Sequence, residues 1–124
     1  MNIHESSEDY LEAILVLGAK NESVRSIDIA KHLGYSKPSV SRAMKLLREN
    51  GYIQTDNNGN IRLTPEGHAI AGRIYEKHQK LAVFLMRLGV REDTAFKDAC
   101  KIEHDISDQT FDRLREWWDK VDDD

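Results

Sequence analysis

Hydrophobic residues recur every three or four positions along most of this chain, and that spacing predicts a mainly helical protein. A first helix is expected from a serine cap, Ser6 or Ser7, to about Lys20. Around residues 52–63 the helical period gives way to two short apolar runs on either side of a turn-forming segment, which predicts a β-hairpin. Further helices are expected over residues 26–33, 36–50, 64–88 and 92–104, and from Ser107 onward.

The two short helices before the hairpin are predicted on either side of Gly34, which can adopt the left-handed conformation that ends many helices. Ser26 is expected to cap the first, Ser36 is expected to cap the second, and Gly51 is expected to close the second. Pro38 falls in a first turn, where its missing N–H is harmless. Two helices joined by a tight break are typical of the helix-turn-helix, whose second helix enters the DNA major groove. The expected buried face of the second helix carries Val40, Ala43, Met44 and Leu47.

Charge sets this segment apart from the rest of the chain. Residues 25–50 carry six basic and two acidic side chains, a balance of +4, in a chain whose net charge is −4. A basic island in an acidic protein is the pattern expected of a phosphate-binding surface. A solvated helix whose positive charges face only water is the alternative interpretation, because a helix-turn-helix is also a common packing unit.

The hairpin that follows favours DNA binding. A hairpin placed directly after the second helix is typical of a winged helix-turn-helix, and it would lay Asn57, Asn58 and Arg62 along the DNA backbone or the minor groove. A hairpin with a purely structural role is the alternative. The combination of both motifs is more specific than either alone.

The composition limits the remaining possibilities. The chain has 124 residues, 40% of them hydrophobic, with no apolar run long enough for a transmembrane helix or a signal peptide. Its single cysteine, Cys100, excludes an intrachain disulfide, so a cytoplasmic location is expected. Residues 81–124 carry 7 basic and 12 acidic side chains, which makes DNA contact by this part unexpected.

The last predicted helix is unusually rich in aromatic residues. Phe111, Trp117 and Trp118 lie on or near one apolar stripe, together with Leu114. These side chains exceed what a small monomer easily covers, which indicates an interface with a second copy of the chain. Packing within one chain explains the same residues equally well.

Several polar side chains fall where helices bring them together. Asp9 and Glu12 are three residues apart, so both project from one helix face; they either complement the helix dipole or repel each other unless a cation lies between them. His78 falls on an apolar stripe and must find a partner there. The next helix carries a set that shares one face: Cys100, Glu103 and His104. No oxyanion-hole element or His-Glu-x-x-His motif accompanies them, so the chain is not expected to be an enzyme.

These residues lie within longer runs that resemble a known family. The runs are SEDYLEAIL at 7–15, IDIAKHLGYSKPSVSRAMKLLRENGYI at 27–53, LTPEGHAIA at 63–71, KHQKLAVFL at 77–85 and ACKIEHDISD at 99–108. They are similar to the metal-dependent repressors of the DtxR/MntR family, over nearly the whole chain. The resemblance implies a winged helix-turn-helix DNA-binding domain at residues 1–72 and a helical metal-binding and dimerisation domain at residues 73–124. It also implies a homodimeric repressor with Mn(II) or Fe(II) as corepressor.

The resemblance further implies roles for particular residues. Asp9 and Glu12 resemble the manganese-dependent branch, whereas Cys100 is the ligand type of the iron-dependent branch. Phe96 and Ala82 stand where the family often has ancillary metal ligands. The implied metal ligands are Asp9, Glu12, His78, Cys100, Glu103 and His104. The residues expected at DNA are Ser36, Lys37, Pro38, Ser39, Arg42, Lys45, Arg48 and Arg62. Those expected at the dimer interface are Phe111, Leu114, Trp117 and Trp118.

The expected function is therefore metal-responsive repression. A metal ion bound between the first helix and the dimerisation helices would select the dimer geometry that fits a palindromic DNA operator. No membrane and no organic cofactor are expected. A metal-independent winged-helix dimer that senses a small molecule is the alternative function. Zn(II), Co(II) and Ni(II) would bind the same ligands in vitro.

Overall fold

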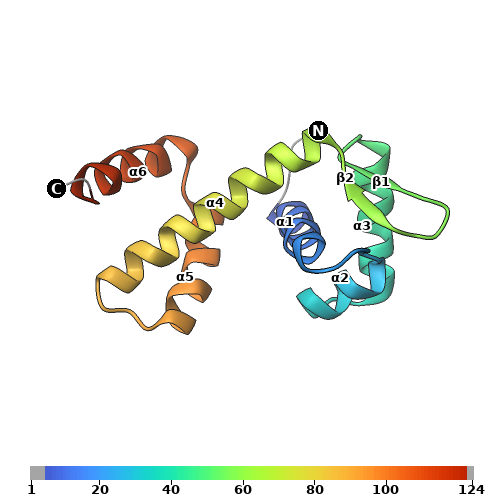
Figure 1. Cartoon of the computed structure of the whole chain (residues 1–124), viewed down its shortest axis with the longest axis horizontal. Coiled ribbons are helices and arrows are strands. Elements are labelled where there is room, and N and C mark those ends of the chain that lie inside the picture. Colours follow the sequence, from blue (N-terminus) through green and yellow to red (C-terminus); the bar gives the residue numbers. More distant parts are fainter. Residues whose placement is uncertain (1–4, 123–124) are drawn as a thin grey trace. The chain divides into compact units, whose positions relative to one another are not determined.

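A computed structural model describes residues 5–122 of the chain (Figure 1). The described part is mainly helical, which confirms the predicted fold class. It divides into two units, the first ending at Arg73 and the second beginning at Ile74, and one helix, α4, contributes to both. The elements, in chain order, are α1 (Glu5–Lys20), α2 (Ser26–Leu33), α3 (Lys37–Glu49), β1 (Ile53–Thr55), β2 (Ile61–Leu63), α4 (Pro65–Arg87), α5 (Glu92–Asp105) and α6 (Asp108–Asp122).

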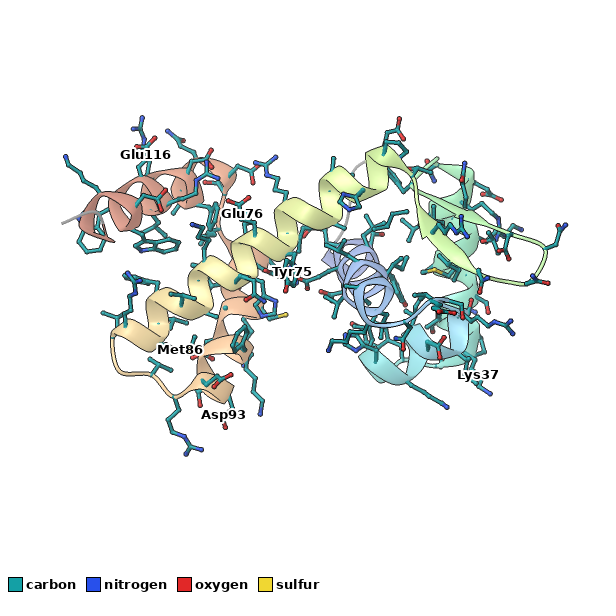
Figure 2. All side chains as sticks on the ribbon, viewed as in Figure 1. Lys37, Tyr75, Glu76, Met86, Asp93 and Glu116 are labelled. Carbon is teal, nitrogen blue, oxygen red and sulfur yellow. The ribbon has the colours of Figure 1, made fainter. Side chains whose placement is uncertain are left out.

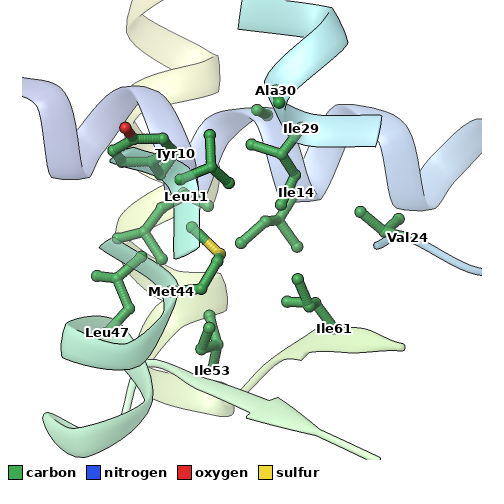
Figure 3. Packing of buried hydrophobic residues seen from close by; sticks show 13 residues of the cluster. Tyr10, Leu11, Ile14, Val24, Ile29, Ala30, Met44, Leu47, Ile53 and Ile61 are labelled. Atoms are coloured by element: carbon green, nitrogen blue, oxygen red, sulfur yellow. The ribbon is translucent and has the colours of Figure 1, made fainter. Parts of the chain in front are cut away.

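The first unit surrounds a core to which α1, α2, α3 and both strands contribute (Figure 3). The predicted buried face of α3 is confirmed, because Val40, Met44 and Leu47 are at most 3% exposed and Ala43 packs against the same cluster. Burying a side chain of this size contributes about 1.5–3 kcal/mol. The helix-turn-helix is thus held by the same core that holds α1. The largest fully buried side chains are Leu11, Ile29, Val40, Leu47 and Ile53.

The helix ends in this unit follow the predicted chemistry with two exceptions. Gly34 ends α2 at a φ of 73°, and the Ser36 hydroxyl accepts a hydrogen bond from the Ser39 amide at 3.3 Å, as expected of a cap. The prediction that Ser26 caps α2 is wrong: Arg25 occupies the cap position, where its amide donates to the Asp28 carboxylate at 2.9 Å. The reason is that an acid at the third helical position can satisfy the cap backbone.

The start of α1 is the second exception. The helix begins at Glu5, before the predicted serine caps Ser6 and Ser7, so neither is needed to start it. The side chain of Ser6 lies outside the described residues, as does the end of the acidic terminal run at residues 122–124.

The predicted hairpin is present as an antiparallel pair of three-residue strands. Its register places Gln54 opposite Arg62, and both side chains are exposed. Ile53 and Ile61 are buried in the core, at 1% and 5% exposure. One face of the hairpin therefore anchors it to the helices, and the other face is open to a ligand.

The second unit contains the rest of α4, α5 and α6. Phe84 of α4 stacks on Trp118 of α6 with ring centroids 4.9 Å apart. Phe111 meets the same Trp118 ring edge-to-face, with centroids 6.0 Å apart. Two ion pairs tie the same helices: Lys77 to Asp108 at 3.0 Å, and Glu76 to Arg115 at 3.2 Å (Figure 2 labels Glu76 on α4).

The apolar stripes predicted for this unit are only partly buried. Phe111 and Trp118 are 3% and 6% exposed within their own chain, whereas Trp117 is 56% exposed. Leu88, the last residue of the helix predicted over residues 64–88, is 66% exposed and lies just beyond the end of α4 at Arg87. None of the described helices is long and apolar enough to span a membrane.

The junction between the hairpin and α4 depends on a close backbone contact at Gly67. Thr64 donates its hydroxyl hydrogen to the Gly51 carbonyl at 2.7 Å and accepts from the Gly67 amide at 3.1 Å, which draws the first turn of α4 against Tyr52. A Cβ at position 67 would overlap the Tyr52 carbonyl oxygen. A Cβ at Gly72, further along the same helix, would meet no atom within 4 Å.

We therefore expect opposite effects from two identical substitutions. Gly67→Ala should lower the free energy of unfolding by about 1–3 kcal/mol, because the backbone must move to admit the methyl group. Gly72→Ala should leave it unchanged or raise it by up to about 1 kcal/mol, since alanine favours a helix over glycine. Urea denaturation followed by circular dichroism measures both. Equal effects at the two positions would contradict the described contact.

Candidate metal centre and nucleic-acid interface

The outward face of α3 is a row of basic and hydroxyl side chains. Lys37, Lys45 and Arg48 are exposed, and Figure 2 shows Lys37 at the beginning of the helix. Ser41, which the sequence interpretation missed, is exposed in the same row. Its position midway between Lys37 and Lys45, four residues from each, is the signal that could have found it. A helix with such a basic and hydroxyl face suits the DNA major groove, which is wide enough to admit an α-helix.

Contacts on the protein surface orient several of these side chains. Ser36 donates to the Ser39 hydroxyl at 2.8 Å, and Arg42 donates to the same hydroxyl at 3.5 Å. Arg48 donates to Thr55 of β1 at 3.2 Å, which links the end of α3 to the hairpin. The first turn of α3 contains no acidic residue, so its positive dipole end is open to phosphate. The side chains predicted to contact DNA thus start from a partly ordered arrangement.

The tip of the hairpin is built around Asp56. Its carboxylate accepts hydrogen bonds from the amides of Asn58 and Asn60 at 2.8 and 3.0 Å. The hydrogen bond from the Asn60 amide, with a smaller contribution from Asn58, lowers the pKa of Asp56 below its ordinary value. Arg62 projects beside this turn and lines a shallow groove that reaches Arg48. The predicted wing is therefore an ordered loop with basic side chains along one side.

Four of the predicted metal ligands form two close pairs in the second unit. Ligand atoms of Cys100 and His104 on α5 lie within 4.8 Å of each other, as do those of His78 on α4 and Glu103 on α5. The Glu103 carboxylate lies 3.7 Å from the His104 ring nitrogen Nε2. Glu103 is 4% exposed, and an ionised carboxylate at that depth is costly unless positive charge or hydrogen bonds compensate it.

The orientation of His78 is determined by the backbone of α5. Its Nε2 donates to the Phe96 carbonyl oxygen at 2.9 Å, since a carbonyl can only accept. The neutral ring therefore carries its lone pair on Nδ1, the nitrogen that can bind a metal. The Phe96 ring supports His78 edge-on, with ring centroids 5.7 Å apart. A histidine whose second nitrogen is held by a carbonyl is a common arrangement at metal sites. Sequence reasoning missed this role of Phe96, because a backbone carbonyl leaves no mark in the side-chain pattern.

The two remaining predicted ligands lie on α1, in the first unit. Asp9 and Glu12 are both partly buried, and Asp9 accepts a hydrogen bond from the Tyr35 hydroxyl at 3.4 Å. Burial raises the pKa of the neighbouring Tyr10, and the positive charge of Arg42 partly opposes that effect. That Asp9 and Glu12 share an ion with the four residues of the second unit stays a prediction.

The donor set fits a transition metal. A thiol, two imidazoles and a carboxylate suit divalent ions of the first transition row, and they do not suit Mg²⁺ or Ca²⁺, which prefer oxygen ligands. Holding one such ion would place positive charge next to the buried Glu103 carboxylate.

Comparison with protein families assigns both units. A family model described as the iron dependent repressor, N-terminal DNA binding domain, matches residues 2–60. A second model, described as the iron dependent repressor, metal binding and dimerisation domain, matches residues 64–124. The two models together cover almost the whole chain.

Individual relatives agree with this assignment. An HTH-type transcriptional regulator of Methanocaldococcus jannaschii is 36% identical over 121 residues, which are 96% of this chain and 97% of that protein. The transcriptional regulator MntR of Salmonella typhimurium is 38% identical over 108 residues, 87% of this chain and 69% of that protein. The solved structure of the manganese regulator SloR is similar with a TM-score of 0.79 and 31% identity. That match covers 96% of this chain and 55% of the SloR chain, so the present chain spans about half of it. This chain belongs to the iron-dependent repressor family.

Proposed function

We propose that this protein is a metal-responsive transcriptional repressor that binds a palindromic DNA operator as a homodimer. One observation carries the proposal: two close pairs of metal-type donors, Cys100 with His104 and His78 with Glu103, occur in one chain with the exposed basic face of α3. The family models matched by the two units name metal binding, dimerisation and DNA binding, and relatives such as MntR are transcriptional regulators.

In the proposed site, Asp9 and Glu12 of α1 join His78, Cys100, Glu103 and His104 as ligands of Mn(II) or Fe(II). Such an ion would supply positive charge that compensates the negative charge of the carboxylates. The chain supplies the mechanical part of the response, because α1 packs into the core of the helix-turn-helix through Leu11 and Ile14. Residues that hold α1 in place therefore also hold α3 in place. Zn(II), Co(II) and Ni(II) would satisfy the same donors in vitro.

At DNA, the first turns of α3 would enter the major groove. Arg42 is the proposed reader of guanine, because its guanidinium can donate two hydrogen bonds to one base edge. Lys45, Arg48 and Arg62 would hold phosphates, since basic contacts to the backbone fix position rather than sequence. Ser36, Lys37, Pro38 and Ser39 would approach the groove floor from the N-terminal end of the helix.

A second copy is proposed to cover the exposed aromatic face of the second unit. A groove of about 600 Å³ between α4 and α6 is lined by apolar side chains that include Val83, Leu88 and Trp117. These three side chains are 42%, 66% and 56% exposed. Apolar surface of this extent usually marks an interaction site. Phe111, Leu114 and Trp118 would support the interface from beneath rather than contact the partner directly.

This role is regulatory and not enzymatic, and a regulator that reads chromosomal DNA would act in the cytoplasm. The alternative, a metal-independent dimer that senses a small molecule, differs in one measurable respect. Its DNA affinity would not change when a chelator removes metal.

Removing the buried carboxylate tests the metal dependence. Glu103→Ala should reduce Mn(II)- or anaerobic Fe(II)-stimulated DNA binding by roughly 10–100-fold or more. Removing a residue that only orients a metal ligand typically lowers metal affinity by that factor, and removing the ligand itself should cost at least as much. The matched control is Glu92→Ala, an exposed acid on the same helix, which should keep the response. Fluorescence anisotropy, with and without metal, provides the measurement, using a labelled duplex that the wild-type protein selects from random palindromic sequences in Mn(II). A full metal response in the Glu103 variant would contradict the proposed site.

Truncating the most exposed tryptophan tests the dimer face. Trp117→Ala should raise the dissociation constant of the dimer about tenfold or more, because tryptophan side chains at interface centres often contribute over 2 kcal/mol. Leu46→Ala, which removes an exposed side chain of the first unit, is the control and should not change it. Sedimentation equilibrium gives both constants. A dimer of unchanged strength would place the interface elsewhere.

A further inference from the structure

Tyr35 joins a proposed metal ligand to the beginning of the DNA-reading helix. It lies in the turn between α2 and α3, directly before Ser36, which caps α3. Its amide donates to the Ala30 carbonyl at 3.1 Å, so its backbone belongs to the turn itself. Its hydroxyl donates to the carboxylate of Asp9 on α1, 26 residues earlier in the sequence, at 3.4 Å. One side chain thus spans from the turn to the acid.

The ring of Tyr35 has a defined support. It meets the ring of Tyr10 edge-to-face, with centroids 5.6 Å apart and an interplanar angle of 73°. Tyr10 is 6% exposed and belongs to the core of the first unit, so it gives Tyr35 a rigid surface to lean on. The position of the Tyr35 hydroxyl is therefore tied to the position of the turn. All of these contacts lie within the first unit.

The hydrogen bond between Tyr35 and Asp9 is long, so a small movement of either residue would change its strength. At 3.4 Å it is longer than the 2.5–3.0 Å typical of O–H···O bonds, so a displacement of a few tenths of an ångström would strengthen or break it. Carboxylates that bind metals usually accept a hydrogen bond on an oxygen or lone pair that the ion does not use, and that bond orients the ligand. The Tyr35 hydroxyl is in place to do this for Asp9.

We propose that Tyr35 is a positioning residue that couples metal binding at Asp9 to the placement of α3. The inference rests on the proposed function, because it takes Asp9 as a metal ligand. When Asp9 is held in one rotamer, its carboxylate anchors the Tyr35 hydroxyl, and Tyr35 then holds the turn from which α3 starts. Because such coupling is reciprocal, DNA that holds the turn in place tightens metal binding through the same contact.

The test removes the hydroxyl and keeps the ring. For Tyr35→Phe, operator affinity is measured by anisotropy in chelator and in saturating Mn(II), with a labelled duplex that the wild-type protein selects from random palindromic sequences in Mn(II). The ratio of the two operator affinities, the metal stimulation, should fall about three- to tenfold, the usual size of one hydrogen bond. Affinity in chelator should match wild type. Tyr52→Phe, a partly buried tyrosine of the same unit, is the control and should keep the full ratio.

A second variant separates coupling from general damage. In chelator, Tyr35→Phe should cost no operator affinity in either the wild-type or the Asp9→Asn background, because the contact acts only when a metal orients Asp9. An unchanged ratio in Tyr35→Phe would overturn the proposal while leaving the metal-responsive function intact. Equal losses of operator affinity with and without metal would mean that Tyr35 has only a structural role, and they would also overturn the proposal. If wild type itself shows no metal stimulation, the proposed function fails, and the role of Tyr35 fails with it.

Discussion

The constraint on which this structure depends is the burial of one ionisable carboxylate, that of Glu103, among other side chains that can bind a metal. Burying an ionised carboxylate costs free energy. Glu103 is 4% exposed and lies close to His78 and His104. Such burial requires compensating charge or hydrogen bonds, and a divalent cation supplies the largest compensation that these donors can share. The second unit is assembled to hold the donors steadily, with the Phe96 carbonyl aligning His78 and ion pairs binding α4 to α6.

The first unit turns a local constraint on one helix into a constraint on the DNA-reading surface. Helix α1 carries the two acids Asp9 and Glu12 on one side and core residues on the other. Since protein cores are close-packed, α1 cannot shift without moving the helices packed against it. The Tyr35 contact adds a shorter route, from Asp9 directly to the turn before α3. Under the proposed function, a metal bound by Asp9 would therefore act on α3 without a large rearrangement inside this unit.

The helices, the hairpin and most helix ends could be predicted from the sequence because they depend on local rules. Gly34, Ser36 and the Thr64-Pro65 pair determine their helix ends through backbone chemistry within a few residues. The cap at Arg25 could not be predicted, because local rules allow either the Ser26 hydroxyl or the Asp28 carboxylate to accept a backbone hydrogen bond at the start of α2. In the structure the Asp28 carboxylate accepts it, from the Arg25 amide. The exposure of Leu88 depends on where α4 ends relative to its neighbours, which helical spacing does not encode.

The residues of the candidate site also divide into those that local spacing predicts and those that depend on tertiary contacts. Spacing alone indicated that Cys100, Glu103 and His104 share a face, and the family resemblance implied His78, whose ligand atom the structure places within 4.8 Å of that of Glu103. The Phe96 carbonyl and the Tyr35 hydroxyl were beyond sequence reasoning, because both act through tertiary contacts between residues 18 and 26 positions apart. Residues that orient a site are harder to predict than residues that form it.

At the centre of the proposed function, a metal ion would take ligands from α1 and from α4 and α5 together. Diffraction from crystals grown with excess Mn(II), recorded at its absorption edge, tests this most directly. We expect an ion bound by Asp9 or Glu12 together with His78, Glu103 or His104. An ion held entirely by residues after Ile74, with both α1 carboxylates in solvent, would contradict it.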